Sequence, residues 1–482
     1  MKKASILILF IAFFGEIRGQ SECNCAQNFT VLQQKVRNNY AGFDNRINAK
    51  NKAVFAVLTD SVAKVTVKIT DGYACYTLME RWISFFRDGH LYLTTTYPPT
   101  GESPNSPKMT GLDSLAFDTY LKQNKDKLSP LEGIWRDDDG SYMVAIKRDD
   151  PASAAFSATI LKAKSTKWKV GMQKFILKGT EDAFKMEYFM GDFSVKKDNG
   201  KQQENLLILE QLGAWEKVFP EPKIKLDPQK VANDQIANFK ILDDQTSYLR
   251  VKTFNAGPDV IDNIIKENRE RLLNTPRLII DIRGNGGGSN SNYHSILPFF
   301  YTQPYTLEGK GAFVLASEDN IAIEKKTYEQ AWNSLSEESK KMHAKDYDGW
   351  KKYVDTMAMN QGKRYYYAPS EVTKFDSITT NPKQVAILMD KNCYSTAEWF
   401  VMEAEYSKKV TLFGQNTGGV MDNTNVRPHA LACPAYTILA ASGRRGGADE
   451  REIDNIGFKP NVYIDEKEED WVKFVLDYWE KK

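Results

Sequence analysis

An almost continuously apolar strand that ends in a cluster of glycines constrains this chain more than any other feature. Residues 276–283 read PRLIIDIR, and residues 284–288 follow with four glycines and one asparagine. An apolar run without alternation is typical of a strand buried on both faces, as in a parallel sheet. Glycines let the chain turn tightly without side chains, so that backbone N–H groups are exposed and can hold an anion. We therefore expect an α/β fold with a functional loop at the end of this strand.

The glycine loop does not match either of two known nucleotide-binding motifs. Ser289 stands where a dinucleotide-binding fingerprint has its last glycine, and no acidic residue occupies a clear second-strand position. The loop is also too short for a phosphate-binding loop and lacks its lysine. A simple turn would not need so many glycines, so we expect the loop to hold a transient anion, such as the oxyanion of an attacked carbonyl.

The chain begins with a segment typical of export. Residues 1–19 contain two lysines, an apolar run over 6–14 and then small and polar residues, which is the pattern of a secretory signal peptide. The run is too short to span a bilayer, and no later segment is apolar enough to do so. The 65 Lys and Arg residues nearly balance 63 Asp and Glu residues, which gives no support for nucleic-acid binding. We expect an exported protein, periplasmic or extracellular, without a membrane span.

The remaining chain divides into three parts with different hydrophobic periods. Residues 20–125 carry apolar side chains at helical intervals and include Asp88-Gly89-His90. Residues 126–235 alternate with a period of two, which predicts a small antiparallel barrel or sandwich with a structural or substrate-gating role. Residues 236–482 alternate strands with helices, as α/β domains do. Within them, the charged stretch 318–364 predicts a helical insertion on the surface.

The five cysteines do not define a framework of their own. Their number is odd, and none of their spacings is that of a metal site or a redox motif. Cys393 and Cys433 are one possible disulfide pair. We do not expect a cysteine nucleophile.

Ser395 has two interpretations that share one geometry. It lies between the strand 385–389 and an apolar helix, and Glu398 follows three residues later, which is the pattern of a capping box. A serine at a helix N-terminus can also be a nucleophile, because the helix dipole stabilises developing negative charge and the N–H of Thr396 can donate to an oxyanion. The second interpretation needs a base, and spacing alone does not choose among the four histidines.

Four motifs in a fixed order resemble one known family. They are LIIDIRGNGGG at 278–288, YSTAE at 394–398, GQNTGG at 414–419 and IGFKPN at 456–461. Together they resemble the C-terminal-processing-peptidase and tricorn-protease family of serine peptidases. The resemblance implies a crotonase-like (ClpP-like) α/β catalytic domain. Asp88-Gly89-His90 is similar to the histidine segment of the tricorn-like branch.

The resemblance also implies how the serine is activated. Val420 occupies the position where the processing-peptidase branch has its lysine, and valine cannot accept a proton. The tricorn-like arrangement remains, with Ser395 as nucleophile, His90 as general base and Asp454 assisting. A histidine suits this task because an unperturbed imidazole titrates close to neutral pH.

For the oxyanion hole, the resemblance points to the backbone N–H groups of Thr396 and of Gly287 or Gly288. No carboxylate-binding loop of the PDZ type is evident, and the β-rich segment stands in its place. Arg427 could instead bind a substrate carboxylate, as could Arg444 or Arg445.

The expected function is therefore that of an exported serine endopeptidase acting on peptides or unfolded proteins, with no metal or organic cofactor implied. A non-catalytic module that binds hydrophobic ligands or peptides on the same fold is the alternative. A weaker third possibility is a lysine-dependent peptidase that uses Lys408 or Lys409. The sequence predicts neither the cleavage preference nor the oligomeric state.

Overall fold

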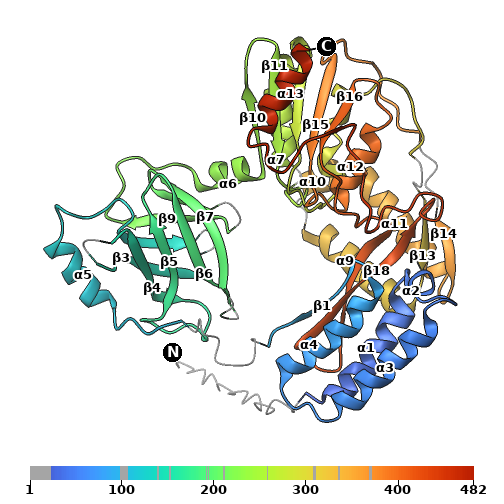
Figure 1. The fold of residues 1–482 in the computed structure, drawn as a ribbon, viewed down its shortest axis with the longest axis horizontal. Coiled ribbons are helices and arrows are strands. Elements are labelled where there is room, and N and C mark those ends of the chain that lie inside the picture. The colour runs from blue at the N-terminus through green and yellow to red at the C-terminus, as the bar shows by residue number, and fades with distance from the viewer. Residues whose placement is uncertain are drawn as a thin grey trace, which may run out of the picture.

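The fold consists of an N-terminal helical part, a β-barrel and an α/β part with two sheets (Figure 1). The structure is a computed structural model, and it describes residues 23–481 except 98–106, 138–139, 151–152, 192, 194, 210–211, 258, 308–310, 335–336, 343 and 368–371. The predicted signal peptide, residues 1–19, lies outside the described residues, as does His343. In the part of the chain that is described, no helix is long and apolar enough to cross a membrane.

The N-terminal part is a group of helices that pack on a short strand. The helices are α1 (Cys25–Asn39), α2 (Phe43–Arg46), α3 (Lys52–Thr66) and α4 (Gly72–Ile83), followed by the 3₁₀ turn η1 (Ser84–Phe86) and the strand β1 (Leu91–Thr95). Apolar side chains at helical spacing, such as Phe29, Leu32 and Val36, are buried against β1 and its neighbour in one core. The last helix and the turn thereby lead His90 to the edge of a sheet.

Residues 133–219 form a closed antiparallel barrel, which confirms the barrel-like fold predicted from the two-residue period. Its strands are β2 (Gly133–Asp137), β3 (Tyr142–Arg148), β4 (Ala155–Ala163), β5 (Gln173–Gly179), β6 (Phe184–Phe189), β7 (Val195–Gln203), β8 (Leu206–Leu209) and β9 (Ala214–Phe219). Large apolar side chains, among them Trp135, Phe175 and Trp215, fill its interior. The helix α5 (Ser114–Gln123) precedes the barrel, and α6 (Pro228–Ile236) follows it.

The first sheet of the α/β part is six-stranded, with the order β10-β11-β12-β15-β16-β19. Its strands are β10 (Ala237–Ile241), β11 (Thr246–Val251), β12 (Arg277–Asp281), β15 (Gln384–Met389), β16 (Val410–Gly414) and β19 (Val462–Tyr463). All neighbours are parallel except β10 and β11. In β12, Leu278 and Ile280 belong to one core and Ile279 to the core on the other face. The apolar run of β12 is therefore explained by burial on both faces.

Helices cover both faces of this sheet. They are α7 (Asp259–Glu267), α8 (Arg269–Asn274), α12 (Thr396–Ala404) and α13 (Trp471–Glu480). Phe400 and Val401 of α12 pack in the core that contains Leu278, whereas Trp471 and Trp479 of α13 pack in the core that contains Ile279. This arrangement is the α/β layering that the alternating pattern predicted.

The second sheet is five-stranded and antiparallel, and it joins the N-terminal part to the rest. It contains β1, β13 (Ala312–Leu315), β14 (Arg364–Tyr367), β17 (Asn423–Ala430) and β18 (Tyr436–Arg445). Not every strand of residues 236–482 belongs to the parallel sheet, because β13, β14, β17 and β18 form this second one. Leu91 pairs with Ala440 and Leu93 with Ile438, so β1 is an integral strand beside β18.

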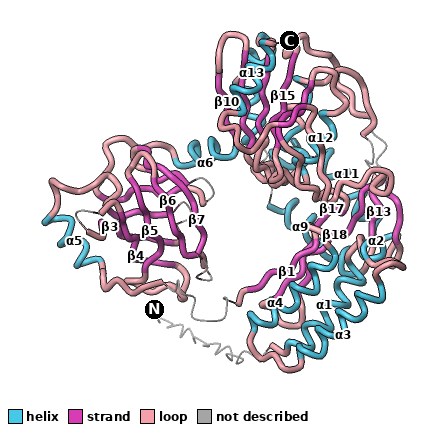
Figure 2. Tube along the Cα trace, in the orientation of Figure 1, coloured by secondary structure: helices cyan, strands magenta, loops and turns pink. Residues whose placement is uncertain are grey.

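The charged stretch 318–364 is helical, with α9 (Glu318–Ser334), α10 (Glu337–Met342) and α11 (Ala344–Met359). Figure 2 shows α9 and α11 beside the strands of the second sheet. Several of its side chains line a cavity described below, so the insertion is more than a solvated surface.

Two disulfides join distant segments, Cys23 to Cys433 and Cys25 to Cys75, and Cys393 is buried and free. The Cys393–Cys433 pair considered from the sequence is therefore wrong. Cys393 follows β15 beneath the serine turn, whereas Cys433 lies between β17 and β18 next to the N-terminal helices.

Candidate active site

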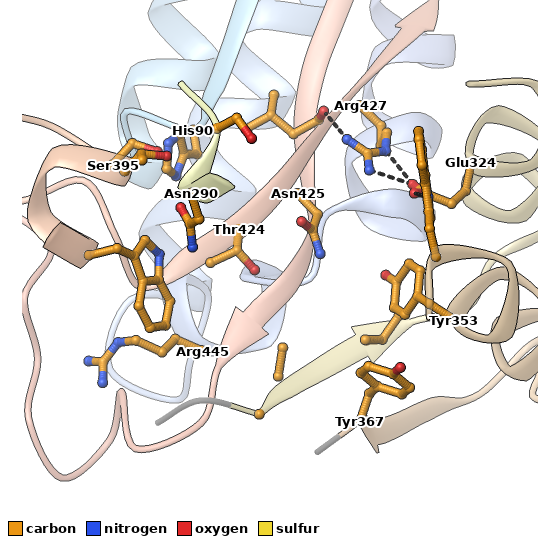
Figure 3. Close-up of a pocket in the computed structure, with 18 of the residues that line it drawn as sticks. His90, Asn290, Glu324, Tyr353, Tyr367, Ser395, Thr424, Asn425, Arg427 and Arg445 are labelled. Carbon is orange, nitrogen blue, oxygen red and sulfur yellow. Dashed lines mark hydrogen bonds and ion pairs between the residues drawn. The ribbon is translucent and has the colours of Figure 1, made fainter. Parts of the chain in front are cut away.

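A cavity of about 700 Å³ lies where the N-terminal part, the glycine loop and the helical insertion meet. His90 and Ser395 both line it, together with Gly288, Thr396 and Arg427 of the residues predicted from the sequence (Figure 3). His90 and Ser395 lie 305 positions apart in the chain, and the pairing of β1 with β18 attaches the His90 segment to the α/β part that carries Ser395. Asp454 and Gly287 are not among the residues that line this cavity.

Ser395 occupies a sharp turn between the strand β15 and the helix α12. Its backbone has φ 54° and ψ −115°, a conformation that non-glycine residues rarely adopt. The backbone N–H donates to the carbonyl oxygen of Val420 and to Glu398 Oε2, at 3.1 Å in both cases. A strained serine on a strand-to-helix turn is the arrangement that presents a nucleophilic hydroxyl at the top of a sheet.

Glu398 does more than the capping box predicted. Its side chain is fully buried, and it accepts hydrogen bonds from the Thr417 hydroxyl at 2.6 Å and from the N–H groups of Gly419 and Val420 at 2.8 Å each. Burial raises the pKa of this carboxyl group, although the hydrogen bonds oppose the shift. Glu398 thereby ties the GQNTGG segment to the serine turn. The sequence did not predict this second task.

The glycine loop lies against the serine turn so closely that side chains are excluded. A Cβ on Gly287 would be 3.0 Å from Ser395 Cβ, and one on Gly288 would be 2.0 Å from the carbonyl carbon of Phe254. Both glycines have positive φ, 99° and 145°. The loop therefore needs glycine at these two positions for steric and conformational reasons.

The two candidate oxyanion glycines differ in whether their N–H groups are free. The N–H of Gly287 donates to Asn285 Oδ1 at 2.9 Å. The N–H groups of Gly288 and Thr396 have no hydrogen-bond partner among the described residues, and both residues line the cavity. Gly288 and Thr396 are thus the pair with donors available to a ligand.

His90 is held by the Asp88 side chain on one side and by a backbone carbonyl on the other. Its own N–H donates to Asp88 Oδ1 at 2.8 Å, and its Nδ1 is hydrogen-bonded to the carbonyl oxygen of Asn423. A carbonyl oxygen can only accept, so Nδ1 must carry the proton in this contact. In the neutral imidazole, Nε2 then has the free lone pair that a general base requires.

Among the described residues, Asp454 has no hydrogen bond or ion pair with the His90 ring. It is buried and accepts from the N–H groups of Met421 and Asp422 at 2.7 and 2.8 Å and from the Arg46 guanidinium. Burial, helped by the neighbouring carboxylates Asp88 and Asp422, raises the pKa of Asp454 to about 6. Its contacts hold the chain that leads into β17.

A hydrogen-bonded network that the sequence did not predict connects Asp454 to the histidine. The Asn423 side-chain amide donates to Asp88 Oδ2 at 2.8 Å and reaches Asp454 Oδ2 at 3.5 Å, and the Tyr40 hydroxyl also donates to Asp88. Asn423 thus binds His90 through its backbone carbonyl, and it binds Asp88 and Asp454 through its side-chain amide. Asp88, within the predicted histidine motif, was the one available sequence signal, because Tyr40, Arg46 and Asn423 lie in no motif.

The arginines considered for substrate binding are all engaged in ion pairs. Arg427 is bonded to the buried Glu324 at 2.5 Å, Arg444 to Asp449 at 2.6 Å and Arg445 to Asp422 at 2.6 Å. Arg427 and Arg445 nevertheless line the cavity. A carboxylate ligand would have to compete with Glu324 for Arg427.

Lys409 lies at the opposite end of the strands from Ser395, so it is not placed to act on the serine. It precedes β16, whose first residue pairs with the start of β15, whereas Ser395 follows the end of β15. Its Nζ donates to the carbonyl oxygen of Thr379 at 2.6 Å, before β15 begins. Five residues of strand, roughly 17 Å, separate the two ends of β15.

Comparisons with known proteins were made for the whole chain. No curated protein matches it. Among solved structures, mature CPAF has 12% identity over 91% of this chain and 92% of its own, with a TM-score of 0.47. The photosystem II D1 C-terminal processing protease has 11% identity over 92% and 93%, with a TM-score of 0.37. The tricorn protease has 9% identity over 95% of this chain and 36% of its own, with a TM-score of 0.40.

A family model does match, and it covers the part of the chain that carries the motifs. Residues 245–464 match the family described as peptidase family S41. The matched range contains the glycine loop, Ser395 and Asp454, whereas His90 lies outside it. The resemblance to the C-terminal-processing and tricorn peptidases is thereby confirmed over residues 245–464, and this part of the chain, a little under half of it, matches peptidase family S41, a family of serine peptidases.

Proposed function

We propose that the protein is an exported serine endopeptidase that cleaves peptides or unfolded proteins through an acyl-enzyme on Ser395. The observation that carries the proposal is the presence of Ser395 and His90 in one cavity, the serine on a strained turn and the histidine fixed in the tautomer of a base. The family match covers Ser395 but not His90, so the choice of base rests on this geometry.

The reaction follows from these positions. Ser395 Oγ attacks the substrate carbonyl while His90 Nε2 accepts the hydroxyl proton, and the same imidazolium then protonates the leaving amine. The N–H groups of Gly288 and Thr396 stabilise the oxyanion of the tetrahedral intermediate. Water then attacks the acyl-enzyme with His90 as base, which releases the second product and restores Ser395. Each oxyanion donor is worth roughly 10²–10³ in rate.

Asp454 assists indirectly in this mechanism. It anchors the N–H groups of Met421 and Asp422, which directly precede Asn423, and Asn423 binds His90 through its carbonyl oxygen. Asp454 is therefore a positioning residue. The stabilising contact on the imidazole comes from a backbone carbonyl, which is polar but carries no net charge.

Two disulfides support an exported location. Such bonds persist in oxidising compartments and are rare in the cytosol of mesophiles. Cys23–Cys433 and Cys25–Cys75 both fix the helical part that supplies His90. The periplasm or the extracellular space would keep this part attached to β18.

Cleavage of blocked peptides tests the proposal. A diverse library with acetylated N-termini and amidated C-termini should be cut at internal bonds by the wild-type protein, as read by mass spectrometry. Ser395→Ala should abolish cleavage, and Lys409→Met should retain it. A folded wild-type protein that cuts nothing would overturn the proposal and favour the binding module. Activity that persists in Ser395→Ala would overturn the role of the serine.

A further inference from the structure

We propose that the far end of the cavity is a subsite for a large apolar, preferably aromatic, substrate side chain about four residues from the scissile bond. This inference rests on the proposed function and adds a substrate preference to it. It concerns the helical insertion, whose side chains wall the cavity opposite Ser395 (Figure 3).

The strand β17 provides the path from the catalytic residues to this end. Four consecutive residues of β17, 424–427, line the cavity. Successive side chains of a regular strand point to opposite faces, but Asn425 has φ 57° and interrupts this alternation, so neighbouring residues of β17 can line one cavity. Among the described residues, β17 pairs only with β18, so no strand pairs with its other edge. An extended peptide can add to such an edge through main-chain hydrogen bonds.

The two ends of this path are marked by named contacts. Asn423, the first residue of β17, binds His90, and Arg427 binds Glu324 of α9. Four residues of strand span roughly 13 Å. A substrate strand that runs beside β17 therefore places a side chain about four residues from the attacked carbonyl at the Arg427 end.

Aromatic rings form the walls at this end. Trp350 and Tyr353 come from α11 and Tyr367 from β14, and all three line the cavity. The rings of Tyr353 and Tyr367 have centroids 5.1 Å apart and lie edge to face. A further aromatic or aliphatic side chain that packs against these rings would gain contacts of the same kind.

The charges at this end cancel each other. Glu324 is 2% exposed and accepts from Arg427 Nε at 2.5 Å with one oxygen and from Trp350 Nε1 at 2.7 Å with the other. An acidic side chain would meet Glu324, and a basic one would meet Arg427. The neutralised pair therefore favours an uncharged side chain over either.

Binding to a catalytically inactive protein tests the subsite without relying on turnover. Blocked alanine peptides with one central Phe, Leu, Ala, Asp or Lys should bind Ser395→Ala, and the Phe peptide should bind about tenfold more tightly than the Ala peptide. Tyr367→Ala in the same background should remove most of this difference. Tyr366→Ala is the matched control, because Tyr366 neighbours Tyr367 on β14, is exposed and does not line the cavity. Equal binding of all peptides, or tighter binding of the Asp peptide through Arg427, would overturn the subsite.

Cleavage by the active protein separates this inference from the proposed function. In longer alanine peptides with a single Phe, the wild-type protein should cut a bond about four residues from the Phe, on one side of it. Cleavage without a fixed distance to the Phe would overturn the subsite while leaving the peptidase intact. A wild-type protein that binds the Phe peptide but cuts nothing would support the subsite and overturn the peptidase.

Discussion

The carbonyl oxygen of Asn423 accepts the hydrogen bond of His90 Nδ1, so a backbone group has the place that a buried carboxylate has in a Ser-His-Asp triad. The contact fixes the tautomer as the carboxylate would, yet it supplies no negative charge to the imidazolium. The acids Asp88 and Asp454 lie one contact further away, on the Asn423 amide. Removing either acid should therefore cost less than removing His90.

The Asn423 amide should be worth a measurable share of catalysis. Asn423→Ala keeps the carbonyl but removes the amide contacts to Asp88 and Asp454, which lets the start of β17 and the imidazole shift. We expect kcat to fall by about 10- to 100-fold with little change in KM, because misplacement of a catalytic group affects the chemical step. Steady-state kinetics on a cleaved peptide would measure this. Asn274→Ala, at the exposed end of α8, is the control, and an equal effect there would contradict the prediction.

The two ends of the glycine loop should tolerate substitution very differently. A Cβ on Gly288 would lie 2.0–2.2 Å from backbone atoms of Phe254 and Asn255, whereas one on Gly286 would meet nothing within 4 Å. Gly288→Ala should therefore lower kcat/KM by at least about 10², the value of one oxyanion donor, and Gly286→Ala should stay near the wild type. Circular dichroism would establish that both variants are folded. Comparable activity in the two would argue against the loop as oxyanion hole.

The stability of the site should depend on the protonation of Asp454. Its pKa is raised to about 6 by burial and by Asp88 and Asp422, against about 3.9 in an unfolded chain. Between these values the folded protein binds more protons than the unfolded one, so this group's contribution is lost as pH rises from 4 to 6. The free energy of unfolding of Asp454→Asn should therefore rise relative to that of the wild type, by up to about 2 kcal/mol between pH 4 and 6. Thermal unfolding at several pH values would measure the difference. Asp449→Asn is the control, because Asp449 is exposed, and it should show no such trend. A wild-type protein that becomes more stable relative to Asp454→Asn as pH rises would refute the prediction.

The barrel should show the opposite dependence on pH through Lys174. This lysine is buried, donates to the carbonyl oxygen of Phe189 and lies 3.9–4.4 Å from the rings of Tyr142, Trp168 and Tyr188. Burial lowers its pKa to about 7. The unfolded chain then binds more protons between pH 7 and about 10, so stability rises with pH in this window.

Lys174→Met should consequently be more stable than the wild type near pH 7, with an advantage that shrinks toward pH 10. Unfolding followed by tryptophan fluorescence at several pH values would measure the difference. Lys178→Met on the same strand is the control, since its side chain is 62% exposed. A constant difference between Lys174→Met and the wild type would show that Lys174 does not titrate in this range.

Local sequence patterns were sufficient for the elements that carry Ser395. The uninterrupted apolar run predicted a strand buried on both faces, and Leu278 and Ile279 do pack in different cores. The glycines predicted that the loop backbone lies close to another segment, and Gly287 does lie close to Ser395. These features are determined by residues that are neighbours in the chain, so the hydrophobic period and the residue types are sufficient to predict them.

The partners of His90 could not be predicted in the same way. Asn423 lies 333 positions from His90, and Tyr40 lies 48 positions from Asp88. These contacts arise from the pairing of β1 with β18 and from the packing of α1 and α2 beside it, which no local period encodes. The disulfide between Cys23 and Cys433 spans 410 positions and is equally invisible in cysteine spacing.

Labelling with a fluorophosphonate tests the central claim most directly, because the probe reacts with a serine only where a base activates it. The wild-type protein should form one adduct, on Ser395, as mapped by mass spectrometry. His90→Ala should abolish the adduct, and Lys409→Met should leave it unchanged. Folded wild-type protein without an adduct, or an adduct that forms equally in His90→Ala, would contradict the pairing of Ser395 with His90.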